Sequence, residues 1–163
     1  MVVQNPTGTA GTRETRQVVQ ATQIGASLQV VCLLLPLLDL WVLGTVERHV
    51  QAAYPQWGPD NVSADRTAIV VALVAVSVLG LACWLVSMWV ARRGRGVRAT
   101  MTTLFILGTL TLLTVAGMGG GAYDQIVPLW LGLTSLVLPV LPGLAAVVAA
   151  WSGRSRAYSP SGK

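Results

Sequence analysis

The stretch WVARRGRGVR (residues 89–98) decides the fold of this chain. It places four arginines and two glycines between two long apolar runs. Glycine tolerates the backbone conformations of a tight turn, and a connection this short joins antiparallel neighbours. We therefore expect a helix on each side of this stretch, with the two helices packed next to each other in opposite directions.

The composition is that of a membrane protein. Of the 163 residues, 53% are hydrophobic and only 10% are charged, whereas soluble domains carry about 25% charged residues. The formal net charge of +5 raises nucleic-acid binding as an alternative, but the basic residues flank apolar runs and form no stripe with aromatic residues. We expect the lipid bilayer as a partner, and no nucleic acid.

Four apolar runs are each long enough to cross a bilayer. A hydrocarbon core about 30 Å thick needs about 20 helical residues. We predict an all-α bundle of four transmembrane helices, with spans at about 24–43, 67–90, 100–118 and 126–151. The first run is longer than the apolar core of a cleaved signal peptide, typically about 7–15 residues, so we expect a retained helix.

The segments outside the spans are polar. We predict a flexible tail at 1–11, one transmembrane domain at 12–151 with an outer loop at 44–66 and a basic loop at 91–99, and a basic tail at 152–163. In the outer loop, Val46, Val50 and Ala53 recur at helical spacing. We therefore expect the first helix, or a short helix of the loop, to continue until Pro55 stops it.

The basic residues predict how the chain is threaded. Nine of the eleven fall on one side of the predicted membrane: Arg13, Arg16, Arg92, Arg93, Arg95, Arg98, Arg154, Arg156 and Lys163. Only Arg48 and Arg66 fall on the other side. Because short cytoplasmic segments carry an excess of Lys and Arg, we predict a multi-pass protein of the cell (inner) membrane with both termini in the cytoplasm. We expect the arginines of the basic loop to fix this topology and to contact anionic lipids of the inner leaflet.

Small residues predict where helices approach one another closely. One stripe lies on the second span (Ala68, Ala72, Ala75 and Ala82), and another lies on the fourth (Gly132, Gly143 and Ala146). Such stripes let helices pack at short range within a bilayer. We expect these residues to mediate helix packing, either within the bundle or between copies of the chain.

Asp39 is the one acidic residue within a predicted span. Intramembrane carboxylates are costly to bury and are often functional. Asp39 is therefore the candidate proton or ion site, and Pro36 would help to shape a polar pocket beside it. The alternative is structural: Asp39 lies near enough to the outer interface to be hydrated, or it pairs with Arg48 or Arg66.

No motif in the chain predicts catalysis, a cofactor or a metal. His49 is the only histidine, which excludes a bis-histidine haem site and an H-E-x-x-H helix. Cys32 and Cys83 form no C-x-x-C pair, and we expect them to pack as small hydrophobic residues, with a disulfide as the alternative. No serine in the spans has a histidine partner for nucleophilic catalysis. A membrane enzyme is therefore the least favoured of three functional hypotheses, and the two that rank above it are given below.

Two segments resemble small four-helix integral membrane proteins of actinobacteria, most of them uncharacterised. The segments are ARRGRGVR at 91–98 and AAWSGRSRAY at 149–158. In that class the second helix ends in Arg-Arg-Gly-Arg, and the fourth ends in an apolar run with Trp, followed by Ser and an Ala-Tyr pair. Gly153 and Arg154 stand here where that class has a proline-containing link. The resemblance implies a four-helix inner-membrane protein and supplies no catalytic residue.

Two functions from different classes follow. The first is a non-enzymatic membrane protein of structural, accessory or partner-binding type, whose partner is another membrane protein or a second copy of itself. The alternative is a small proton- or ion-coupled transporter in which Asp39 is protonated and Pro139 and Pro142 break the fourth helix. Small multidrug transporters also have four helices with an acidic residue in the first, but they are shorter, and we find none of their other motifs here.

Overall fold

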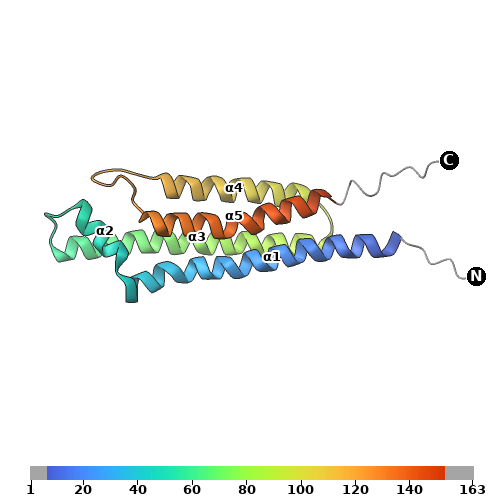
Figure 1. Cartoon of the computed structure of the whole chain (residues 1–163), viewed down its shortest axis with the longest axis horizontal. Coiled ribbons are helices and arrows are strands. Elements are labelled where there is room, and N and C mark those ends of the chain that lie inside the picture. Colours follow the sequence, from blue (N-terminus) through green and yellow to red (C-terminus); the bar gives the residue numbers. More distant parts are fainter. Residues whose placement is uncertain (1–6, 153–163) are drawn as a thin grey trace, which may run out of the picture.

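The computed structural model describes residues 7–152 and is built of helices (Figure 1). The elements are α1 (Thr7–Leu38), the π-helical turn η1 (Asp39–Leu43), α2 (Thr45–Ala53), α3 (Pro59–Arg93), α4 (Val97–Gly117) and α5 (Leu129–Ser152). Within these residues the β-structure is limited to one isolated bridge between Gly120 and Tyr123. Four of the helical segments are long and apolar enough to cross a membrane. The prediction of an all-α fold with four helices long and apolar enough to cross a membrane is confirmed.

The helix ends differ from the predicted spans mainly by extension. α1 begins at Thr7, so residues 7–11, which we predicted to be a tail, continue the helix, because each added residue propagates an existing ladder of hydrogen bonds. α3 begins at Pro59, with Gly58 as its N-cap. Proline suits this first position because its missing N–H would have no intrahelical partner. Residues 1–6 and the basic tail from 153 onward lie outside the described residues.

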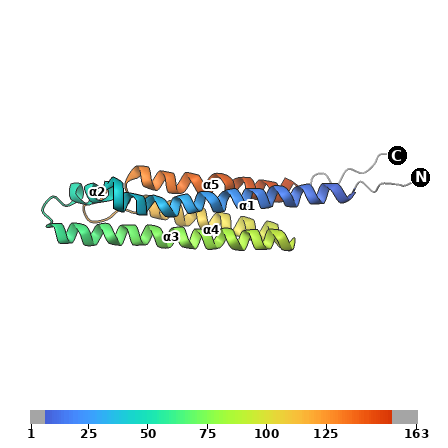
Figure 2. The same cartoon turned by 90° about the horizontal axis from the view of Figure 1, so that it is seen from below.

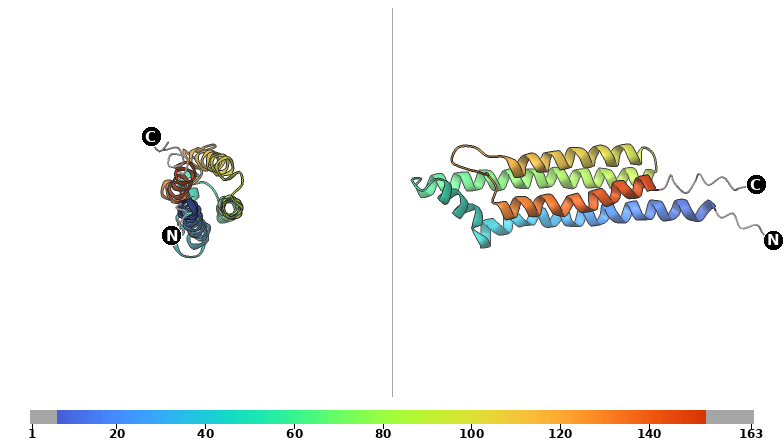
Figure 3. Two further views of the ribbon diagram at one scale, coloured as in Figure 1. Left: turned by 90° about the vertical axis from the view of Figure 1, so that its right-hand side faces the viewer. Right: turned by 45° about the horizontal axis from the view of Figure 1, so that its top comes forward.

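The bundle is built around α1, which packs against both α3 and α5 (Figure 2). α4 packs mainly against α5 and makes much less contact with α3. The end-on view in Figure 3 shows these helices around the bundle axis. The turn between α3 and α4 contains Gly94 and Gly96, both at φ 69°, as the short basic loop predicts. However, α3 and α4 are not closely packed neighbours, because a cavity lies between them.

The buried face of α1 follows a strict seven-residue repeat. The buried positions continue from α1 into the first residue of η1 and alternate in steps of four and three: Val18, Thr22, Gly25, Gln29, Cys32, Pro36 and Asp39. A spacing of 3.5 residues keeps one face of a helix against its partners along its whole length. Small and polar residues occupy much of this seam, whereas Ile24, Val31 and Leu38 are exposed. A lipid-facing surface accounts for that arrangement, because apolar side chains then need no protein cover.

A sharp corner joins α1 to α2. Gly44 adopts a left-handed conformation (φ 61°) directly after η1, so the first helix does not run straight on toward Pro55. α2 instead lies over the end of the bundle opposite the turn between α3 and α4, and it buries Val46 and Val50 against residues of α3 and α5, including Ile69 and Leu131. It ends before Pro55. The prediction of a helix in the outer loop therefore matches the structure, but its continuity with the first span was wrong.

Candidate functional site

Asp39 is fully buried at the corner between α1 and α2. Its carboxylate accepts hydrogen bonds from the backbone N–H of Thr45 at 3.0 Å and of Val46 at 2.9 Å, and from the Thr45 hydroxyl. Trp130 of α5 donates its indole N–H to the same hydroxyl at 3.3 Å. The first amides of a helix lack intrahelical acceptors, and the helix dipole favours a negative charge beside them. Asp39 therefore caps α2 and fixes the corner.

This arrangement differs from both structural alternatives that we predicted for Asp39. The prediction that Asp39 is hydrated near the interface is wrong, because its side chain is fully buried. Pairing with an arginine is also wrong: Arg66 binds Glu47 at 2.6 Å, and Arg48 is exposed. Sequence reasoning missed the capping role because the partners of Asp39 lie six and seven residues further along the chain and reach it only through the bend at Gly44.

A cluster of aromatic and polar side chains stabilises the end of the bundle that carries α2. Tyr54 stacks on Trp57 with ring centroids 3.9 Å apart, and its hydroxyl oxygen accepts the N–H of Ala122. The Tyr123 hydroxyl donates to Asp65. Burial, together with this hydrogen bond to the negatively charged Asp65, raises the pKa of Tyr123 well above its ordinary value. These contacts tie the turn between α4 and α5 to α2 and α3.

His49 belongs to the same cluster. Its Nε2 lies 2.7 Å from the backbone oxygen of Gln125, and its ring stacks against Tyr123 at a centroid distance of 5.5 Å. The imidazole is therefore part of the packing of this end of the bundle. Within the described residues, no group of three His, Cys, Asp or Glu side chains is placed to hold a metal ion.

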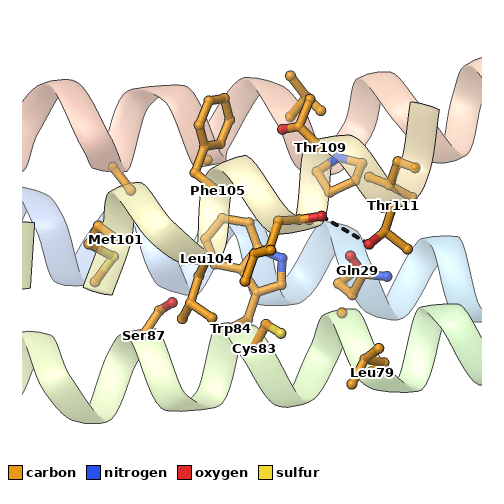
Figure 4. Close-up of a pocket in the computed structure, with 18 of the residues that line it drawn as sticks. Gln29, Leu79, Cys83, Trp84, Ser87, Met101, Leu104, Phe105, Thr109 and Thr111 are labelled. Carbon is orange, nitrogen blue, oxygen red and sulfur yellow. Dashed lines mark hydrogen bonds between the residues drawn. The ribbon is translucent and has the colours of Figure 1, made fainter. Parts of the chain in front are cut away.

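A cavity of about 400 Å³ lies between α3 and α4, with α1 and α5 completing its walls. We call it the α3–α4 cavity. Most of its lining is apolar or aromatic, and its polar side chains include Gln29, Ser87 and Thr109 (Figure 4). It reaches the surface of the bundle, because Leu79 of α3 and Leu107 of α4 both line it and are 60% and 56% exposed. The space is thus open on the side where α3 and α4 separate.

Large side chains fitted against glycines shape the α3–α4 cavity. The ring of Trp84 lies so close to Gly25 of α1 that a methyl group there would overlap it. Phe105 of α4 lies over Gly143 of α5, where an added Cβ would come within 2.8 Å of the ring. These contacts hold α1 against α3 and α4 against α5. Both rings also line the cavity between α3 and α4.

Gln29 of α1 is the buried polar residue at the deep end of the α3–α4 cavity. Its side-chain amide donates to the backbone oxygen of Ser77 on α3 at 3.2 Å. Gly80 makes room for this amide, since a Cβ at that position would lie 2.9 Å from its nitrogen. Gln29 also lines a second, smaller space of about 20 Å³ together with Ser77 and Ser135. We made no prediction for Gln29, although a polar residue within an apolar run is a visible signal.

The residues predicted to mediate helix packing fall into two groups. Gly143 and Ala146 of α5 are buried, and Gly132 lies against Ala116 of α4. The alanine stripe of α3 behaves differently: Ala68, Ala72, Ala75 and Ala82 are all exposed. Packing within the bundle was therefore the wrong interpretation of that stripe. α3 instead turns the face with Ile69, Leu73 and Ser77 inward, where Ile69 and Leu73 join the buried apolar cluster and the backbone oxygen of Ser77 accepts the hydrogen bond from Gln29 of α1.

The turn between α3 and α4 lies at the end of the bundle where α1 begins and α5 ends (Figure 1), and the four arginines of the basic loop lie on or beside this turn. The Arg93 guanidinium sits over the Trp89 ring at 3.7 Å, and Arg98 donates to the backbone oxygen of Ala150 at 2.8 Å. Arg92 contacts the sulfur of Met88 at 3.6 Å. Arg95 is exposed in the centre of the turn. Among residues 16–152, the one ion pair is that of Arg66 with Glu47 at the opposite end.

Comparisons of the chain with protein-family models, with curated proteins and with solved structures found no match. The resemblance to actinobacterial membrane proteins therefore stays a prediction, and the function is argued from the geometry of this chain.

Proposed function

We propose that the chain is a non-enzymatic accessory protein of the cytoplasmic membrane, with both termini in the cytoplasm, and that it binds an apolar chain in the α3–α4 cavity. The observation that carries this proposal is the cavity itself, which has an apolar lining and an opening on the side of the bundle. Cavities of about 300–1,000 Å³ with mostly apolar walls and a few polar groups are the usual form of binding sites.

A cavity of this size, if it were empty, would greatly lower the free energy of unfolding. Unfilled apolar space lowers stability by about 24 cal/mol per Å³, and folded proteins are stable by only about 5–15 kcal/mol. Water gains few hydrogen bonds from this lining, because it offers few polar partners. The bilayer, by contrast, supplies apolar chains directly at the opening between Leu79 and Leu107.

Coupled transport through Asp39 has less support. Its carboxylate is held by three donors at the corner of α2, whereas a coupling site needs a carboxylate free to exchange its proton or ion. α5 runs as one helix from Leu129 to Ser152 through both Pro139 and Pro142, whereas a discontinuous helix is typical of transporter binding sites.

Gly108 offers a direct test, because it lines the α3–α4 cavity and an added Cβ there would meet nothing within 4 Å. We therefore expect the side chain of a Gly108→Leu variant to occupy part of the cavity. Gly117 is the matched control: it lies on the same helix, its Cβ also meets nothing, and it does not line the cavity. Both substitutions remove a glycine from α4. Replacing a glycine in a helix interior, as at Gly108, favours the helix by up to about 1 kcal/mol, and the effect is smaller at Gly117, the last residue of α4.

The experiment places wild type and both variants in lipid nanodiscs that contain a zwitterionic phospholipid with a photoreactive group on its acyl chain. We expect crosslinks on cavity residues such as Cys83 and Phe105 in the wild type and in Gly117→Leu, and a loss of these crosslinks in Gly108→Leu. Labelling of the exposed Leu85 should be equal in all three. Unchanged labelling of Cys83 and Phe105 in Gly108→Leu would refute the proposal.

A further inference from the structure

We propose that the occupant of the α3–α4 cavity is an anionic phospholipid, with one acyl chain inside the cavity and its phosphate at the turn of residues 94–96. This inference rests on the proposed function and adds the class of ligand and the side chains that select it. Three features of the structure support it: the length of the cavity, its position beside the turn, and the distribution of charge along the bundle.

The length of the cavity matches one lipid leaflet. Along α3 its lining runs from Val76 to Ser87, which corresponds to about 16 Å at 1.5 Å per residue. One leaflet contributes about half of a hydrocarbon core that is about 30 Å thick. On α4 the lining runs from Met101 to Leu112, so both walls extend over the same half of the bundle. An acyl chain that enters from that leaflet has room along its whole length.

The turn of residues 94–96 lies at the end of this space. The cavity separates α3 from α4, and the turn joins the same two helices beyond the lining residues Ser87 and Met101. Ala91 and Met101 belong to a buried apolar cluster between the cavity and the turn, so the headgroup reaches the turn along the surface of the bundle. Arg95 is exposed at its centre, and Arg93 is exposed on the last turn of α3. The headgroup of a lipid whose chain fills the cavity therefore meets guanidinium groups, which bind phosphate through short charge-assisted hydrogen bonds.

The charge of the bundle is strongly asymmetric. In residues 16–152 every acidic side chain lies at or toward the end that carries α2: Asp39, Glu47, Asp60, Asp65 and Asp124. None of the arginines at residues 92–98 has a carboxylate partner within that range. Within residues 16–152, no carboxylate therefore balances the positive charge at the turn. A phospholipid with a net negative charge meets this need, and a zwitterionic lipid meets it less well.

Competition between two lipids tests the inference. Wild-type protein is equilibrated in detergent with equal amounts of phosphatidylglycerol and phosphatidylcholine that carry the same acyl chains, and the retained lipids are counted by native mass spectrometry. We expect a preference for phosphatidylglycerol on the order of tenfold. Glycerophosphoglycerol, the headgroup without acyl chains, should not displace the bound lipid, because it leaves the cavity unfilled. Displacement by that compound would assign the site to a free phosphate ester and overturn the inference.

Three variants separate this inference from the proposed function. Arg93→Gln combined with Arg95→Gln should abolish the preference while both lipids are still retained. Gly108→Leu should reduce the retention of both lipids. Arg48→Gln, at the opposite end of the bundle, should leave the preference unchanged. Equal retention of the two lipids by the wild type would overturn the inference and leave the proposed function intact, whereas undiminished retention by Gly108→Leu would overturn the proposed function itself.

Discussion

Replacing Asp39 by asparagine separates a structural carboxylate from a transport site. The two oxygens of Asp39 serve Thr45 and Val46, with the N–H of Val46 at 2.9 Å. Asparagine has one acceptor oxygen, and its amide nitrogen would face an N–H that needs an acceptor. Loss of a hydrogen bond to a charged group, with a buried donor left unsatisfied, costs about 1.5–3 kcal/mol. We expect Asp39→Asn to lower the free energy of unfolding by that amount, and Asp39→Ala to lower it further.

The measurement is reversible unfolding in mixed detergent micelles, with Asp60→Asn as the control. Asp60 lies exposed in the first turn of α3, where a carboxylate contributes about 0.3–1 kcal/mol through the helix dipole. Equal unfolding free energies for Asp39→Asn and wild type would refute the capping role. A flux assay in proteoliposomes tests the alternative: coupled flux that is present in the wild type and absent from a fully stable Asp39→Asn protein would establish Asp39 as a transport site.

Three further predictions follow from the packing. Gly25→Ala should lower the unfolding free energy by about 1–3 kcal/mol, because its methyl group overlaps Trp84; the same change in a Trp84→Ala background should cost much less, and an equal cost in both backgrounds would contradict the contact. Gly108→Leu should raise the thermal midpoint in lipid-free detergent more than Gly117→Leu, since only the former buries its side chain; equal shifts would argue against a fillable cavity. The pKa of Tyr123 is higher in the folded state than its ordinary value of 10.0, so the stabilising contribution of the protonated hydroxyl is full below that pH and is lost as the pH rises through the folded pKa. The wild type should therefore lose stability above pH 10.0 more steeply than Tyr123→Phe. Parallel curves of stability against pH would exclude the hydrogen bond to Asp65.

Features that depend on neighbouring residues could be predicted from the sequence. Hydropathy over about 20 residues locates a span, and glycines flanking Arg95 indicate the turn between α3 and α4. The repeat on α1 was also visible, because Gly25, Gln29 and Cys32 interrupt an apolar run at intervals of four and three. How this repeat is interpreted depends on the solvent around the helix. In lipid, the small and polar residues mark the helix face that packs against other helices, and the large apolar residues face the lipid.

Features that depend on contacts between distant segments could not be predicted. The exposed alanines of α3 show the difficulty, because a stripe of small apolar residues is compatible with lipid as well as with a partner helix, and nothing local distinguishes the two. The α3–α4 cavity is even harder to predict from the sequence. It exists because Trp84 fits against Gly25 and Phe105 against Gly143, and those pairs decide how far α4 lies from α3.

The seven-residue repeat of α1 limits how the length of this protein can change. A single inserted residue between Gly25 and Gln29 would rotate all later positions by about 100° and turn Cys32, Pro36 and Asp39 away from the face that packs against α3 and α5. An insertion of seven residues would lengthen the helix by about 10 Å and restore the same face. Small additions to α1 therefore cannot match this bundle to a thicker bilayer. The bundle can be lengthened to match a thicker membrane only by insertions of whole heptads into α1, or by additions to segments outside the buried repeat of residues 18–39.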